Sequence, residues 1–188
     1  PKAIPLLEDP SKVGYDFGRD PLLPIKGVKP IEEGDVVDLE GIKLEVIDTP
    51  GHTADCISLL DSKNRNIFVS DAVADKTGDT ACVPAICPPS FDPDMYVSTL
   101  EKMKKYDFES VCLGHYGMYY GPDVKEILDE ARTTYKQVWK FFDDNVDKLG
   151  YVEWIADNLI EKFMPNSEII KRTGFLHLIN GYKTYKKL

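Results

Sequence analysis

The sequence predicts an α/β (α+β) protein in which a group of strands precedes a group of helices. Short apolar runs that alternate with polar residues lie between residues 35 and 70, and another apolar run covers residues 110–113. After Pro122, apolar residues recur at helical spacing to the end of the chain. A period of two indicates half-buried strands, whereas a period near 3.6 indicates amphipathic helices. We therefore expect a sheet first and a helical extension from residue 122 to residue 188.

The first 33 residues are predicted to be an irregular connecting segment. Prolines recur there at positions 1, 5, 10, 21, 24 and 30. Each proline removes a backbone donor and clashes with a preceding helical turn, so a long helix is excluded. The regular part of the fold is expected to begin at residue 34.

The spacing of the apolar runs predicts the order of the elements. Turns of only a few residues separate the first four strands, which favours antiparallel pairing. A proline-rich loop then precedes a helix, for which Asp92 is the predicted N-cap and Pro93 the first helical residue. The predicted strands cover residues 35–39, 42–49, 56–60, 66–70 and 110–113, the loop covers 74–91, and three helices cover about 122–150, 152–165 and 167–188.

Composition restricts the classes of function. The net charge of −9 over 188 residues repels a phosphate backbone, so nucleic-acid binding is disfavoured. No apolar run has the length of a membrane span. The four cysteines, Cys56, Cys82, Cys87 and Cys112, lack the usual spacing of zinc-binding pairs. Free thiols in a reducing cytoplasm, and a small-molecule substrate rather than a nucleic acid or a membrane, are the expectation.

Three side chains that can bind metal follow predicted strands. His52 comes after the second strand, Asp71 ends the fourth, and His115 follows the strand at 110–113. Each of them alone is more typical of an ordinary surface or turn residue. Together, at the ends of three strands, they are expected to converge on one edge of the sheet, where sites commonly lie. Gly51 and Gly114 precede the two histidines and permit tight turns there.

The segment from Gly34 to Val73, GDVVDLEGIKLEVIDTPGHTADCISLLDSKNRNIFVSDAV, resembles the metallo-β-lactamase superfamily. Thr-Pro-Gly-His-Thr at 49–53, Ser-Asp at 70–71 and Leu-Gly-His at 113–115 are similar to three of its metal-ligand motifs. The resemblance implies half of an αββα sandwich over residues 34–121. It also implies that His52 binds a first metal and His115 a second, with Asp71 bridging them as the catalytic carboxylate. The two ions are expected to be zinc, with iron or manganese as alternatives.

The superfamily's first-half motif, His-x-His-x-Asp-His, is absent, because His52 is the earliest histidine. Each metal is left with one histidine and a shared carboxylate, so the chain alone is expected to bind metal poorly and to be inactive. The sequence is either a truncated piece of a full enzyme, which we favour, or a natural relative that lost its first half. Half a sandwich exposes an apolar sheet face, so self-association as a dimer, or pairing with the missing N-terminal half, is expected.

The function implied by the resemblance is a metal-dependent hydrolase of esters, thioesters, lactones or amides. Two alternatives remain, an iron-binding oxidoreductase like flavodiiron proteins and a non-catalytic interaction module. Tyr116, in the run with Tyr119 and Tyr120, is a candidate substrate-binding residue because a phenol there can contact a substrate oxyanion. Packing of these aromatic rings is the competing interpretation.

Overall fold

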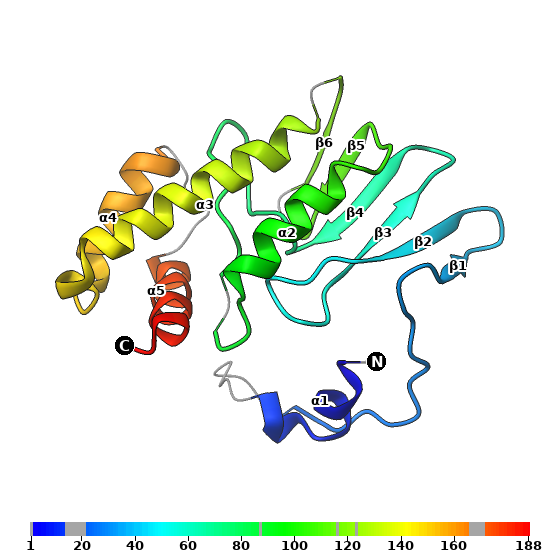
Figure 1. Cartoon of the computed structure of the whole chain (residues 1–188), viewed down its shortest axis with the longest axis horizontal. Helices are drawn as coiled ribbons and strands as arrows, with labels where there is room; N and C mark the ends of the chain where they lie inside the picture. Colours follow the sequence, from blue (N-terminus) through cyan, green and yellow to red (C-terminus); the bar gives the residue numbers. More distant parts are fainter. Residues whose placement is uncertain (1, 14–21, 87, 116, 123, 166–171) are drawn as a thin grey trace.

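A six-stranded mixed sheet forms the centre of the chain (Figure 1). The computed structural model describes residues 2–13, 22–86, 88–115, 117–122, 124–165 and 172–188, with the side chains of 172–174 left aside. The strands follow the order β1-β2-β3-β4-β5-β6, and every neighbouring pair is antiparallel except β4 and β5, which run parallel. Their bounds are β1 Val36–Asp38, β2 Lys43–Asp48, β3 Ile57–Asp61, β4 Asn66–Ser70, β5 Ser110–Leu113 and β6 Met118–Tyr120.

Helices occur before, between and after the strands in the sequence, and two of them pack on one face of the sheet (Figure 1). The helix between β4 and β5 begins as the sequence predicts, because the Asp92 carboxylate accepts hydrogen bonds from the backbone of Asp94 and Met95. Two short 3-10 turns, η1 and η2, complete the helical elements. The bounds are α1 Ile4–Glu8, η1 Pro10–Val13, α2 Pro93–Met103, α3 Glu126–Asp144, η2 Val146–Lys148, α4 Val152–Phe163 and α5 Arg172–Lys186.

The core lies between the sheet and the helices α2 and α3. Alternate residues of the central strands enter it, among them Ile67 and Val111, which pair directly across β4 and β5. Leu100 of α2 and Leu128 of α3 are fully buried in the same cluster. This packing fixes the two helices against one face of the sheet, as one half of a layered α/β sandwich requires.

The other face of the sheet has much less cover. Leu59, Phe68, Cys112 and Met118 are paired across four adjacent strands and therefore point to the same side. Phe68 is 42% exposed and Met118 is 51% exposed. We call these four side chains the open-face row. An apolar row of this kind on one face is what half of an αββα sandwich presents, and the predicted fold class is confirmed.

Several elements differ from the predicted ones, and the segment predicted to be irregular contains the short helices α1 and η1. β6 was not predicted, since Met-Tyr-Tyr carries no alternation of apolar and polar residues and gains strand structure by pairing with β5. The helix expected to continue to Gly150 ends at Asp144, because the backbone leaves helical geometry at Asn145 and η2 follows. In the described part of the chain, no helix is both long and apolar enough to cross a membrane.

Candidate metal centre

His52 is fixed by contacts on both sides of its turn. The turn follows β2 and lies on α2, where the Asp92 N–H donates to the Gly51 carbonyl and the Thr99 hydroxyl donates to the Pro50 carbonyl. Gly51 has φ +146°, and a Cβ at this position would lie 2.6 Å from the Cα of Tyr96. Glycine therefore lets the turn approach the helix closely and points the following imidazole at the sheet edge.

The ring of His52 has its two nitrogens in different roles. Nδ1 bonds to the carbonyl of Ala85, and since a carbonyl only accepts, Nδ1 carries the proton. Nε2 lies 3.6 Å from Oδ2 of Asp71, and the side chain is 17% exposed. This arrangement leaves the Nε2 lone pair available to a cation, which is how a second contact usually orients a metal-binding histidine.

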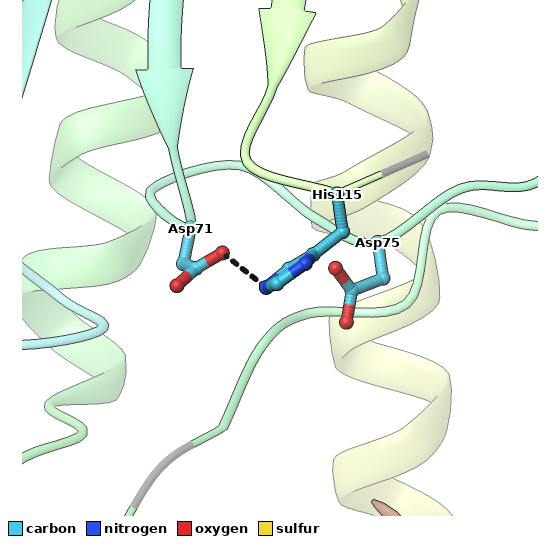
Figure 2. A group of neighbouring side chains, drawn as sticks. All are labelled: Asp71, Asp75 and His115. Carbon is cyan, nitrogen blue, oxygen red and sulfur yellow. Dashed lines mark ion pairs between the residues drawn. The ribbon is translucent and has the colours of Figure 1, made fainter. Parts of the chain in front are cut away.

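Asp71 lies between the two histidines and offers one oxygen to each. It follows β4, where Ser70 adopts φ +49° and its carbonyl accepts a hydrogen bond from the Gly114 N–H. Oδ2 faces His52, while Oδ1 lies 3.4 Å from Nε2 of His115 (Figure 2). A carboxylate in this position can bridge two cations.

His115 follows β5 and is more exposed than His52, at 58% of its side chain. The glycine before it is again closely packed, since a Cβ on Gly114 would lie 2.6 Å from Oδ1 of Asp71 and 2.8 Å from the Ser70 carbonyl carbon. The side chain of any other residue would occupy the place of the Asp71 carboxylate. The structure thus brings together the three side chains that the sequence placed at one sheet edge; their roles as ligands remain predictions.

Asp75 is a further acidic residue at the site, and the sequence analysis missed it. Its carboxylate, one ring nitrogen of His115 and one oxygen of Asp71 all lie within 4.8 Å of one another. Figure 2 shows the imidazole of His115 between the carboxylates of Asp71 and Asp75. Burial raises the pKa of the Asp75 carboxyl, opposed by the nearby His115. The available signal was weak: an aspartate directly after the apolar run Ala72-Val73-Ala74, four residues beyond Asp71.

The donor set fits a divalent metal. Two ligands of one tetrahedral zinc ion lie roughly 3.4 Å apart, given zinc–nitrogen and zinc–oxygen bonds of about 2.1 Å. The distances of 3.4 and 3.6 Å from Asp71 to the two imidazoles are close to this value. Within the described part of the chain, Oδ1 of Asp75 is buried without a hydrogen-bond partner, which is uncommon unless an ion or water satisfies it. Imidazole and carboxylate donors of this kind suit zinc, iron or manganese.

None of the described cysteines belongs to the cluster of Asp71, Asp75 and His115. Burial raises the pKa of the Cys56 and Cys82 thiols. Cys56, Cys82 and Cys112 are free thiols, as expected from the sequence. Tyr116 and Cys87 lie outside the described residues, so the candidate substrate contact of Tyr116 stays a prediction.

The comparisons with known proteins agree on one family. The family model of the metallo-beta-lactamase superfamily matches residues 2–115. A metallo-beta-lactamase family protein from Thermus thermophilus superimposes with a TM-score of 0.57 and 16% identity, covering 87% of this chain and 50% of that chain. An archaeal superfamily protein from Sulfolobus tokodaii gives 0.55 and 19%, covering 100% of this chain and 62% of that one.

A curated relative has higher sequence identity over a shorter segment. A hydroxyacylglutathione hydrolase from Rhodopseudomonas palustris (strain HaA2) is 44% identical over 43 residues, which are 23% of this chain and 17% of that relative. The chain thus spans 50% and 62% of the two solved structures and a small part of this curated relative.

Proposed function

Since the chain belongs to the metallo-beta-lactamase superfamily, we propose that it supplies one side of the dinuclear metal centre of a hydrolase. The observation that carries this proposal is the position of Asp71, with one carboxylate oxygen toward His52 and the other toward His115. In the complete site His52 would hold one cation and His115 the other, with the Asp71 carboxylate between them. Divalent cations there, zinc by preference, would supply Lewis-acid polarisation of the scissile bond and an activated water.

The chain's own residues prepare this chemistry. Ala85 fixes the ring orientation of His52, and Gly114 leaves the space that the Asp71 carboxylate fills. Ester, thioester, lactone and amide bonds are the proposed substrate classes. The relative named hydroxyacylglutathione hydrolase supports testing an acyl thioester first, although the likeness covers only 43 residues.

The partner that we propose is the other half of an αββα sandwich, with its second sheet packed on the open-face row. The exposed Phe68 and Met118 support this, because both are large and apolar. On its own, the 188-residue chain is then expected to self-associate through the same row. Phe68→Glu should shift it toward monomer in analytical ultracentrifugation, and a chain that is already monomeric at high concentration would contradict this part of the proposal.

A reducing compartment such as the cytoplasm is the proposed location. The three free thiols at positions 56, 82 and 112 support it, since such thiols persist where glutathione keeps them reduced.

The test of function uses the protein translated from the complete reading frame that contains these residues. Metal analysis should find zinc, and hydrolysis of at least one of the four substrate classes should fall by at least about 100-fold in Asp71→Asn. Asp79→Asn, which removes an exposed charge from the following loop, is the matched control and should leave the rate unchanged. Iron without hydrolysis would favour the oxidoreductase alternative, and no metal would favour the interaction module; either outcome overturns the proposal.

A further inference from the structure

Asp75 changes the number of ligands that this chain offers to one of the two cations. We propose that Asp75 is a metal ligand and that Asp71, Asp75 and His115 together bind one divalent cation in the chain on its own. This rests on the metal centre proposed above and extends it. For the cation at His52, the chain then offers one histidine and the shared carboxylate of Asp71. For the cation at His115, it offers three protein ligands, the number typical of a catalytic zinc site.

Geometry supports a single cation between the three side chains. Their donor atoms already lie within 4.8 Å of one another, and the pair formed by His115 and Asp71 is at 3.4 Å. A bound cation requires separations of roughly 3.4 Å, so small side-chain rotations would close the triangle. Figure 2 shows the Asp75 carboxylate directed toward the imidazole of His115.

The unsatisfied oxygen of Asp75 gives an independent reason. Oδ1 is buried and has no hydrogen-bond partner among the residues that the structure describes. Leaving a buried carboxylate oxygen unpaired is unfavourable, and the neighbouring negative charge of Asp71 adds repulsion. A cation removes both costs at once, because it binds the oxygen and lies between the two carboxylates.

The loop that carries Asp75 is held in place by contacts that do not involve its carboxylate. Backbone hydrogen bonds join Asp75 to Val83 in both directions, at 2.8 and 2.9 Å. Next to it, Lys76 forms an ion pair with Glu130 of α3 at 2.9 Å and donates to the Thr80 carbonyl. The backbone position of Asp75 is therefore set by the fold, so only its side-chain torsions need to adjust when it binds metal.

The test is a titration of the metal-free 188-residue chain with Co²⁺, whose visible absorption reports on its ligands. One equivalent should bind. Asp75→Asn keeps the side-chain shape and the backbone bridge to Val83 but removes the charge, and we expect it to weaken Co²⁺ binding at least about 10-fold. Asp79→Asn, in the same loop and exposed, is the matched control and should bind as the native chain does.

Two further measurements separate the possible failures. The metal-free Asp75→Asn chain should be at least as stable to urea as the native chain, because it no longer buries an unpaired charge; should it not fold, Asp75→Ser replaces it. If Asp71→Asn loses Co²⁺ binding while Asp75→Asn retains it, the role of Asp75 is wrong and the proposed metal centre stands. If neither variant changes Co²⁺ binding, the cation binds elsewhere and both proposals fail.

Discussion

The two histidines of the site are held very differently. His52 is 17% exposed, is bonded through Nδ1 to Ala85, and follows a glycine that packs against the backbone of α2. His115 is 58% exposed and follows a glycine that packs against Asp71 itself. Contacts with Ala85 and with α2 therefore fix the direction of the His52 side chain before any metal binds. His115 lies instead beside the carboxylates of Asp71 and Asp75.

The largest expected effect is on the His52 side, from Gly51→Ala. The new Cβ would lie 2.6 Å from the Cα of Tyr96, and alanine is strained at φ +146°. We expect the free energy of unfolding to fall by about 3 kcal/mol, measured by urea denaturation. Gly41→Ala is the matched control, since Gly41 has φ +139° with nothing within 4 Å of its Cβ. Equal losses in the two variants would show that contact with α2 does not fix the His52 turn.

On the His115 side, Gly114→Ala should affect metal binding more than folding. Its Cβ would take the place of Oδ1 of Asp71, 2.6 Å away, so the carboxylate must rotate away from His115. We expect Co²⁺ affinity to fall about 10- to 100-fold and the free energy of unfolding by about 1–2 kcal/mol. Gly150→Ala, where nothing lies within 4 Å, should change neither quantity. Native affinity in Gly114→Ala would contradict the close packing of this turn on Asp71.

Tyr96 contacts both the turn that carries His52 and the segment between Asp71 and Asp75, and changing it should give the next largest effect. Its backbone packs under Gly51, and its fully buried hydroxyl donates to the carbonyl of Val73, between Asp71 and Asp75. Tyr96→Phe leaves that carbonyl unpaired, so the free energy of unfolding should fall by about 1–2 kcal/mol in urea denaturation. The exposed Tyr120 is the control, and Tyr120→Phe should have no measurable effect. A neutral Tyr96→Phe would mean that water replaces the hydroxyl and that this bond does not hold the loop.

The smallest effect is expected from Glu130→Gln, which weakens the link between α3 and Lys76. Lys76 is 15% exposed in this ion pair and Glu130 is 39% exposed, so solvent screens part of the attraction. We expect a loss of about 0.5–1 kcal/mol in the free energy of unfolding and about a 2- to 5-fold loss of Co²⁺ affinity on the His115 side. The surface pair of Lys140 and Asp144 provides the comparison, since Asp144→Asn should leave Co²⁺ binding unchanged. A Co²⁺ affinity unchanged in Glu130→Gln would show that the Asp75 loop holds its position without α3.

The local parts of the fold were predictable because local patterns determine them. Alternation located β2, β3, β4 and β5 to within a residue or two at each end, and the Asp92-Pro93 pair located the start of α2. β6 escaped prediction since its three residues become a strand only by pairing with β5. The end of α3 at Asp144 also escaped, because apolar spacing continues beyond it to Leu149.

The sequence by itself determined which strands carry His52, Asp71 and His115, and it indicated the family through the short motifs around them. Only the tertiary structure decided the distances between them and the entry of Asp75 into the site. Strand ends follow from periodicity, which is local. The approach of Asp75 to His115 depends instead on the parallel pairing of β4 with β5 and on a loop held by Tyr96 and Glu130, contacts between residues far apart in the chain.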